Sequence, residues 1–227
     1  MTAVSKEPKQ RSATHVAMQK IRQLIFSGDL VADSNHLETE LAARLGMSRT
    51  PVREATLMLQ SQGLLQVQPR KGIKIKSIAV QDMADIYEML TALECLAAKR
   101  AAQAGLSNKE LKAMRDTIKQ MDSALAEGNR ADWAKADEAF HDELLRLGDN
   151  IHVENTVKMI NDQIRRARLI TLNLRPLPTK SNKDHRKLCQ AILKRDTAMA
   201  VDVLRRHRET ASEILVEALN SAGLKRI

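Results

Sequence analysis

Aromatic side chains are scarce in this sequence of 227 residues, which has two Phe, one Tyr and one Trp. Because proteins that bind single-stranded nucleic acid commonly stack its bases on aromatic rings, this composition argues against a base-stacking platform of that kind. No apolar run approaches the roughly 20 residues that cross a membrane, and the first thirteen residues lack the apolar core of a signal peptide. We expect a cytoplasmic protein with no membrane partner and a disordered N-terminal arm over residues 1–13.

Cysteine is also rare, and the two cysteines, Cys95 and Cys189, are far apart in the chain. Each lies within an apolar helical pattern, where a free cysteine behaves as a small buried hydrophobe. We therefore expect two buried, reduced thiols rather than a disulfide or a redox pair.

Positive charge, in contrast, is abundant and unevenly distributed. The net charge is +9, and residues 1–80 contribute +6 of it, with 12 basic and 6 acidic side chains. Residues 81–227 are nearly balanced, with 25 basic and 22 acidic side chains. An excess of this sign favours a polyanionic partner, so we expect the first third of the chain to contact nucleic acid.

Residues 46–54 are the most informative stretch of the chain. Gly46 is able to adopt the positive φ of a tight turn between two helices. Ser48 or Thr50 is suited to cap the next helix, and Pro51 is tolerated in the first turn of that helix. The stretch therefore predicts the turn and the second helix of a helix-turn-helix.

Two arginines lie at the start of that second helix. Arg49 and Arg53 are four residues apart, so they share one helix face. In helix-turn-helix proteins the N-terminal end of the second helix meets the base edges of double-stranded DNA. We expect Arg49 and Arg53 to read bases in the major groove and Ser48 and Thr50 to contact phosphates.

The surrounding patterns complete a winged helix-turn-helix. Three apolar helical patterns end at Gly28, Gly46 and Gly63, and then the period changes. Residues 65–68 and 73–76 alternate apolar and polar side chains around a turn at 69–72, as a β-hairpin does. This hairpin is the predicted wing, where Arg70, Lys71 and Lys74 would carry positive charge to the DNA backbone or minor groove.

Every strong pattern after Asp82 is helical. The breaks predict six helices, over residues 82–104, 107–127, 130–147, 150–174, 181–195 and 197–222. Ser181 and Asp184 resemble a capping box at the start of the fifth helix. The expected fold is therefore mainly α, with a winged helix-turn-helix domain over 14–78 and an all-α antiparallel six-helix bundle over 79–227.

Three histidines of the second half fall on apolar stripes that mark buried helix faces. Asp137 and His141 are one helical turn apart, so both side chains can point to one place. His185 and His207 each lie eleven residues from the break at Asp196. If the last two helices form an antiparallel hairpin, their imidazoles lie at the same level.

Three imidazoles and a carboxylate form a suitable ligand set for zinc, nickel or manganese, with coordination positions left for water or an acid. The alternative is that the histidines are ordinary core residues paired with carbonyl or carboxylate groups. His15, His36 and His152 lie in polar or terminal contexts, and we expect them on the surface.

Arg168 lies on the apolar face of the helix predicted over residues 150–174. An inward arginine is suited to hold an effector carboxylate with two parallel hydrogen bonds. Pairing with an interior acid such as Glu94, or an outward orientation, are the alternatives.

The helix-turn-helix motif and the set of inward histidines together resemble the GntR family of bacterial transcription regulators, in its FadR-type subfamily with an FCD effector domain. The first match runs from Gly46 through Met47, Ser48, Arg49, Thr50, Pro51, Val52, Arg53, Glu54 and Ala55 to Gly63, Leu64, Leu65 and Gly72. The second comprises Asp137, Phe140, His141, Asp184, His185, Ala191, Ile192, Asp196 and His207. Six helices after the wing resemble the VanR-like branch.

The resemblance implies a bacterial regulator, most simply a repressor, that binds a palindromic operator as a homodimer. It also implies that Asp137, His141, His185 and His207 hold a metal, which helps to bind a small organic acid. Two other hypotheses remain at this point. In one, the helical domain serves only dimerisation or a non-metal effector. In the other, the metal site catalyses a reaction, but no general base or nucleophile with matching spacing supports it.

Overall fold

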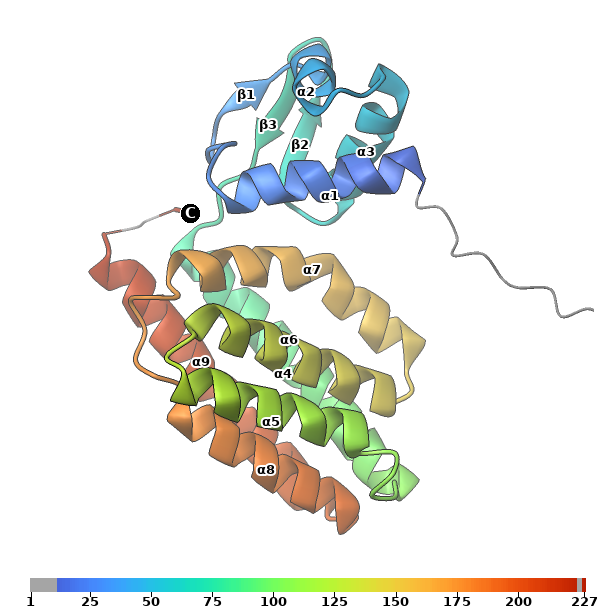
Figure 1. The fold of residues 1–227 in the computed structure, drawn as a ribbon, viewed down its shortest axis with the longest axis vertical. Helices are drawn as coiled ribbons and strands as arrows, with labels where there is room; N and C mark the ends of the chain where they lie inside the picture. The colour runs from blue at the N-terminus through green and yellow to red at the C-terminus, as the bar shows by residue number, and fades with distance from the viewer. Residues whose placement is uncertain (1–11, 224–225) are drawn as a thin grey trace, which may run out of the picture. The chain divides into compact units, whose positions relative to one another are not determined.

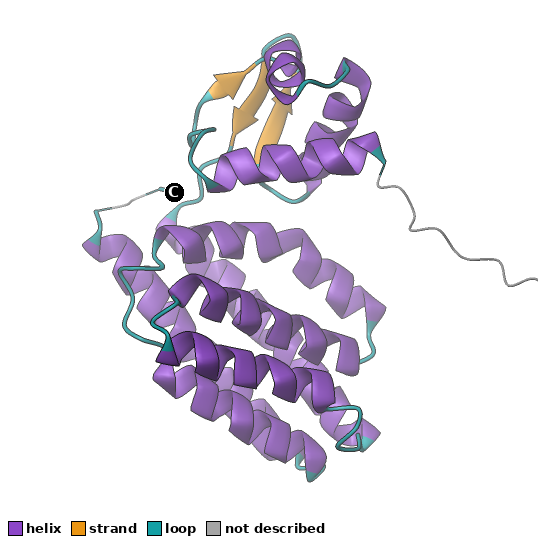
Figure 2. Cartoon of the chain, viewed as in Figure 1, coloured by secondary structure: helices purple, strands orange, loops and turns teal. Residues whose placement is uncertain are grey.

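The computed structural model describes residues 12–223 and 226–227 of the chain (Figure 1). The predicted N-terminal arm therefore lies almost entirely outside the described residues. The chain divides between Ser77 and Ile78 into two compact units, the first with helices and strands and the second helical (Figure 2). Each unit is described here by itself.

The first unit is a winged helix-turn-helix. Its three helices are α1 (Ala13–Phe26), α2 (Glu38–Leu45) and α3 (Arg49–Ser61). Its antiparallel sheet has the strand order β1-β3-β2 and consists of β1 (Asn35–His36), β2 (Leu65–Gln68) and β3 (Gly72–Ile75). The hairpin is the predicted one, with Leu65 opposite Ile75 and Gln68 opposite Gly72. Strand β1 was not predicted, because two polar residues carry no alternating pattern.

Alternation in the hairpin fixes which side chains enter the core of this unit. Ile73 and Ile75 are fully buried against α1 and α3, whose Ile21, Val52 and Leu59 are also fully buried. Since successive side chains of a strand point to opposite faces, Lys74, between Ile73 and Ile75, faces away from this core.

Two glycines occupy backbone positions that other residues rarely adopt. Gly46 ends α2 with φ 64°, which is the predicted turn between the two helices of the motif. Gly72 has φ 86°, and a Cβ there would lie 2.3 Å from the carbonyl oxygen of His36 in β1. The close pairing of β1 with the wing therefore requires a glycine at residue 72.

Over its described residues, 78–223 and 226–227, the second unit contains six helices, as predicted. They are α4 (Val80–Ala104), α5 (Lys112–Ala126), α6 (Arg130–Leu147), α7 (Ile151–Ile170), α8 (Thr179–Leu193) and α9 (Thr197–Ser221). Helix α5 begins five residues later than predicted, after a turn in which the Glu110 carboxylate accepts hydrogen bonds from Ser107.

The predicted capping box of the fifth helix is wrong. Helix α8 begins at Thr179, directly after Pro178, so Ser181 already lies in its first turn. Its amide donates to the Pro178 carbonyl at 3.1 Å, and Asp184 pairs with Lys180 at 2.8 Å. Proline cannot donate a backbone hydrogen bond, and it is therefore well placed at the end of the loop that precedes the helix.

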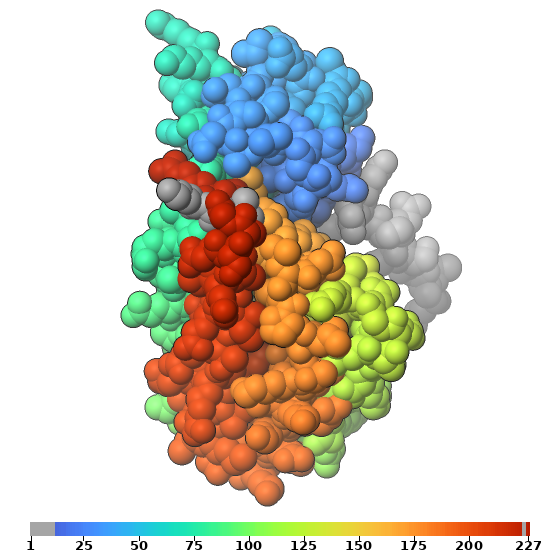
Figure 3. All heavy atoms as spheres, turned by 90° about the vertical axis from the view of Figure 1, so that its left-hand side faces the viewer, coloured from blue at the N-terminus to red at the C-terminus, as the bar shows by residue number. Residues whose placement is uncertain are grey.

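Helix α9 packs mainly against α4 and α8, and Figure 3 shows it (red) between α4 (green) and the orange residues of α7 and α8. Cys95 and Cys189 are free and buried, as expected. The backbone of Ile227 pairs with that of Ile78 through two hydrogen bonds, which joins the end of the chain to the start of α4. Among the described helices, none is both long and apolar enough to span a lipid bilayer.

Replacement of Gly72 by alanine tests the close approach of β1. Gly72→Ala should destabilise the winged unit by at least about 2 kcal/mol, because the new Cβ meets the His36 carbonyl and the positive φ is strained. Gly28→Ala is the matched control, since Gly28 has φ 82° but a Cβ there would have no atom within 4 Å. Hydrogen exchange of residues 12–77 in the full chain measures both, and equal effects would contradict the steric role of residue 72.

Candidate functional site

The predicted DNA-reading residues lie together at the start of α3. Ser48 occupies the N-cap position with an extended backbone, but its side chain makes no capping hydrogen bond. Ser48, Arg49, Thr50 and Arg53 are all exposed. No carboxylate among the described residues forms an ion pair with Arg49 or Arg53, so both guanidinium groups are available to a partner.

The three predicted wing residues differ in their surroundings. Arg70 and Lys71 are exposed at the hairpin turn, where Arg70 adopts φ 63°. Lys74 is half-buried and its Nζ lies 2.8 Å from Asp33 Oδ1. Because Asp33 offsets the charge of Lys74, Arg70 and Lys71 are the stronger candidates for a phosphate contact.

The helical unit brings four predicted residues into one buried cluster. One possible ligand atom from each of Asp137, His141, His185 and His207 lies within 4.8 Å of all the others. The imidazole centroids of His185 and His207 are 4.6 Å apart, so helices α8 and α9 place these two rings at the same level. The juxtaposition expected from the spacing around Asp196 is therefore present.

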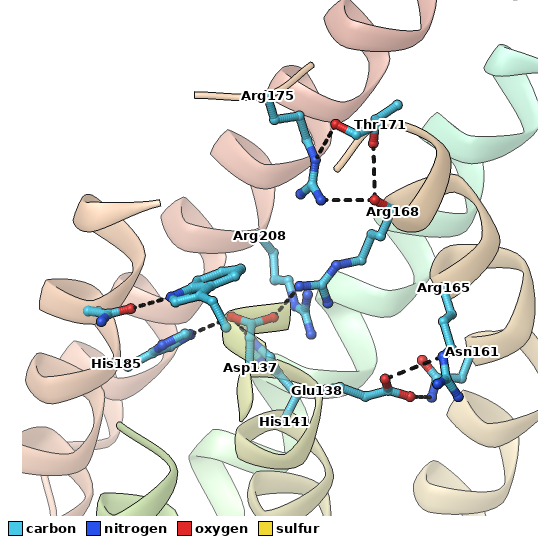
Figure 4. A network of polar contacts seen from close by, with 12 residues as sticks. Asp137, Glu138, His141, Asn161, Arg165, Arg168, Thr171, Arg175, His185 and Arg208 are labelled. Carbon is cyan, nitrogen blue, oxygen red and sulfur yellow. Dashed lines mark hydrogen bonds and ion pairs between the residues drawn. The ribbon is translucent and has the colours of Figure 1, made fainter. Parts of the chain in front are cut away.

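Asp137 is the centre of this cluster (Figure 4). Its Oδ2 accepts a hydrogen bond from the Arg168 guanidinium, and its Oδ1 faces the histidines, at 3.6 Å from His185 Nε2 and 3.9 Å from His141 Nε2. Burial opposes the charged form, but the guanidinium charge of Arg168 outweighs burial and holds the pKa of this carboxyl far below its usual range. Asp137 is therefore an ionised buried carboxylate.

Arg168 thus lies inward, as its stripe indicated, and its partner is Asp137 rather than Glu94. Its side chain is 14% exposed, and the ion pair raises its pKa although burial alone would lower it. The role predicted for Arg168, a contact with an effector, requires it to face both Asp137 and a ligand.

Glu94 and Arg208 form a second buried ion pair beside the cluster, which the sequence patterns did not reveal. Arg208 donates to both carboxylate oxygens of Glu94, with Nε 2.6 Å from Oε2. Glu94 Oε2 also lies 3.1 Å from His141 Nδ1. Burial would raise the pKa of Glu94, but Arg208 and then His141 lower it to about 2. A carboxylate in this position is suited to orient a metal-ligating imidazole.

Two of the imidazoles lack ordinary hydrogen-bond partners. Within the described residues, neither ring nitrogen of His141 or of His185 makes a hydrogen bond of normal geometry, although all four atoms are buried and Glu94 Oε2 lies 3.1 Å from His141 Nδ1. An unsatisfied buried polar group costs about 1–3 kcal/mol. Burial also lowers the pKa of His185 to about 3 and that of His207 well below 6.5, so both are neutral at pH 7. Neutral imidazole is the form that binds a metal.

These observations fit a divalent metal ion. Ligand bonds of about 2 Å require donor atoms about 3–4 Å apart, which small side-chain rotations would achieve here. The ionised carboxylate of Asp137 and the three buried imidazoles supply the donors, and Glu94 supplies a second carboxylate behind His141. The cluster is therefore able to hold a divalent metal ion.

A cavity of about 200 Å³ opens onto this cluster. Asp137 and His207 line it together with Arg168 and Arg208. The sole tryptophan, Trp133, forms part of its apolar wall together with Tyr87, Leu177, Ala211 and Ile214. Polar residues of α8 and α9 and the loop between α7 and α8 also line it, among them Lys180, Ser181, Asp184 and Thr210. The cavity therefore joins the possible metal site to a space of small-molecule size.

The position of the Trp133 ring is held by a polar chain. Its Nε1 donates to Asn182 at 2.9 Å, and Asn182 donates to Asp122 at 2.8 Å. This connection ties α6 to α8 and α5 at the cavity wall.

The other histidines lie outside the cluster: His15 and His152 are exposed and His36 is half-buried, so only His36 departs from the expected surface position.

Comparison with known proteins identifies both units. Residues 85–210 match the family described as "FCD domain", and residues 13–75 match "Bacterial regulatory proteins, gntR family". An uncharacterized HTH-type transcriptional regulator from the TAR-I ttuE-ttuC' intergenic region of Agrobacterium vitis is 38% identical over 145 residues, which cover 63% of this chain and 82% of that protein.

A second relative and a solved structure are similar over longer stretches. The HTH-type transcriptional repressor RspR of Escherichia coli (strain K12) is 25% identical over 176 residues, which cover 78% of this chain and 77% of RspR. The structure of E. coli McbR/YncC has a TM-score of 0.76 at 19% identity and covers 92% of this chain and 99% of its own. At this identity the structural similarity supports the fold.

Loss of a cluster histidine should lower metal content. His185→Ala and His207→Ala each remove one donor, and the protein purified without a chelator or histidine tag should then hold less metal than the wild type. Elemental analysis measures the content, with His152→Ala as the control for an exposed histidine. Unchanged content in either cluster variant would remove that residue from the ligand set.

Loss of the Glu94 carboxylate should be strongly destabilising. Glu94→Gln leaves the Arg208 guanidinium buried without its counter-ion, and we expect the free energy of unfolding to fall by about 3–5 kcal/mol. Urea denaturation in the presence of a chelator, followed by Trp133 fluorescence, reports on the helical unit.

The matched control is Asp202→Asn, which breaks an exposed pair with Arg206 of similar two-bond geometry. Its effect should be much smaller, since water solvates both groups. A similar loss in the two variants would show that burial adds nothing to the Glu94–Arg208 pair.

Proposed function

Because the chain belongs to the GntR family of bacterial regulators and carries an FCD domain, we propose that it represses transcription under the control of a small organic acid. The family and the relatives are transcriptional regulators rather than enzymes. In this proposal a homodimer binds a palindromic operator in the bacterial cytoplasm. The acid binds in the helical unit, at or near a divalent metal.

One observation carries the proposal: the cavity of about 200 Å³ opens directly onto the Asp137–histidine cluster. A metal held there would supply positive charge and free coordination positions for a carboxylate. Arg168 lines the same cavity, where its guanidinium is able to meet an acid while Asp137 holds it in place. The apolar wall around Trp133 would cover the carbon skeleton of the ligand.

The DNA-binding half of the proposal rests on the exposed arginines of α3. Arg49 and Arg53 have no acidic partner among the described residues, and arginine forms two parallel hydrogen bonds with guanine in the major groove. Arg70 and Lys71 of the wing add charge for the phosphate backbone. Ser48 and Thr50 are exposed beside Arg49 and are suited to phosphate contacts.

Dimerisation gives the acid a means to control DNA binding. Two recognition helices must match two half-sites about one helical turn apart, so a small change in their spacing alters the affinity. An acid that binds one arrangement of the dimer more tightly shifts the population toward that arrangement. The repressor role is proposed by analogy with the relative RspR, which is named a repressor.

Native mass spectrometry of the full chain, purified without a chelator or histidine tag, tests the proposal in one measurement. The expected masses are those of a dimer with metal and, where it co-purifies, a small acid. A dimer with less than about a tenth of an equivalent of metal would instead favour a helical unit that only dimerises or binds a non-metal effector. In that case the Asp137–Arg168 ion pair would be a structural feature of the core.

Substitution of single basic residues separates base reading from phosphate contact. Arg49→Ala should reduce the preference for the operator over unrelated DNA, since each lost bidentate base contact costs about 1–3 kcal/mol. Lys71→Ala should weaken binding to all sequences by a similar factor and reduce the salt dependence by about one counterion. Gel shifts at several salt concentrations measure both effects.

Arg206→Ala is the control, because it removes one exposed positive charge from α9 of the helical unit. Its affinity and salt dependence should equal those of the wild type. If Arg49→Ala retained the full operator preference, the assignment of Arg49 as a base-reading residue would be wrong.

A further inference from the structure

The basic groups around the cavity differ in how their charges are balanced. Arg168 pairs with Asp137, Arg208 with Glu94 and Lys180 with Asp184. Arg175 also lines the cavity, but it forms no ion pair with a carboxylate of the described residues. It is therefore the cavity cation whose charge has no acidic partner within the described part of the chain.

Arg175 lies in the loop between α7 and α8 and is half-buried. Its Nε donates to the Thr171 carbonyl at 3.4 Å and its Nη2 to the Arg168 carbonyl at 3.0 Å (Figure 4). The loop is held in turn by Arg130, which donates to the carbonyls of Leu172 and Arg175. A guanidinium has five N–H donors, so Arg175 keeps donors beyond those used by the backbone.

The electrostatics of Arg175 favour an anion at this place. Burial and then the neighbouring Arg168 lower its pKa to about 10, so it remains a cation at pH 7 in an unfavourable setting. An anionic group beside it would remove that unfavourable interaction. In Figure 4, Arg168 and Arg208 lie between the Arg175 side chain and the carboxylate of Asp137. A metal held by the Asp137–histidine cluster and the Arg175 guanidinium would therefore be two separate places that attract negative charge.

The size of the cavity limits what can bridge them. An apolar cavity of about 150 Å³ accommodates a ring of six carbons, so about 200 Å³ suits a molecule of a few more atoms. The cavity lining also includes apolar side chains, among them Trp133, Leu177 and Ile214. A short carbon chain with a charged group at each end matches this arrangement.

We propose that Arg175 binds a second carboxylate, so that the effector is a small dicarboxylic acid with its first carboxylate at the Asp137–histidine cluster. This rests on the proposed function, in which the cavity takes an organic acid. The loop that carries Arg175 is then a specificity element, because the chain length between the two carboxylates must match the span of the cavity.

A purely structural role for Arg175 is the competing explanation. Arginines often hydrogen-bond the last carbonyls of a helix, and Arg175 does so after α7. Arg100 provides a matched control, since it donates to the carbonyls of Gly148 and Asp149 after α6 at 2.6 and 2.7 Å. Arg100 does not line the cavity. Removal of either arginine loses similar backbone bonds, and only removal of Arg175 alters the cavity.

The test is a binding titration of full-length protein supplied with Zn²⁺. Succinate is compared with butyrate and glutarate with valerate, two pairs that differ by one carboxylate at constant chain length. Fluorescence of Trp133 reports binding, because it is the only tryptophan and lines the cavity. Calorimetry gives an independent dissociation constant. The variants are Arg175→Gln, Arg175→Lys and the control Arg100→Gln.

In the wild type, a diacid should bind about tenfold or more tightly than its matched monoacid, as a charged hydrogen bond predicts. Arg175→Gln should remove this preference and leave monoacid affinity within about twofold. Arg175→Lys should retain part of the preference, because it keeps the charge without the planar fork. Arg100→Gln should keep the wild-type preference.

Three results would overturn the proposal in distinguishable ways. Equal binding of the matched mono- and diacids by the wild type would exclude the second carboxylate site and leave the proposed function intact. Equal weakening of both acids in Arg175→Gln would assign a structural role to Arg175. Failure of every acid to bind the Zn²⁺-supplied protein would reject the dicarboxylate and the proposed acid control together.

Discussion

The carboxylate of Asp137 lies between the guanidinium of Arg168 on one side and the imidazoles of His141 and His185 on the other. A buried carboxylate is expensive unless opposite charge and hydrogen-bond donors surround it. Helix α7 must therefore bring Arg168, and α8 and α9 must bring His185 and His207, to one point on α6. The packing of the helical unit around its cavity depends on this constraint.

The Glu94–Arg208 ion pair is a second buried carboxylate–guanidinium pair next to Asp137 and Arg168. Glu94 faces His141, while Arg208 lines the cavity next to His207 in the sequence. Arg168 and Arg208 thus each connect a carboxylate near the histidines with the space open to a ligand. A ligand that accepts hydrogen bonds from Arg168 or Arg208 would change the charge balance around Asp137 or Glu94. Binding in the cavity would in this way be coupled to the possible metal site.

Arginine serves opposite purposes in the two units because its surroundings differ. In the winged unit, Arg49 and Arg53 are exposed and have no acidic partner among the described residues, which suits contact with DNA. In the helical unit, Arg168 and Arg208 are enclosed and bound to carboxylates. The motif around residues 46–54 is recognisable from the sequence and has the expected local structure. The roles of the buried arginines depend instead on which carboxylates they contact.

The sequence by itself determined the winged motif, the number of helices and the inward faces that carry His141, His185 and His207. These follow from periods and spacings within single helices or one hairpin, which are local properties. Only the tertiary structure decided that Arg168 meets Asp137, 31 residues away, and that Arg208 meets Glu94, 114 residues away. It also decided the pairing of β1 and the position of Arg175, because contacts between distant segments leave no periodic signal in the chain.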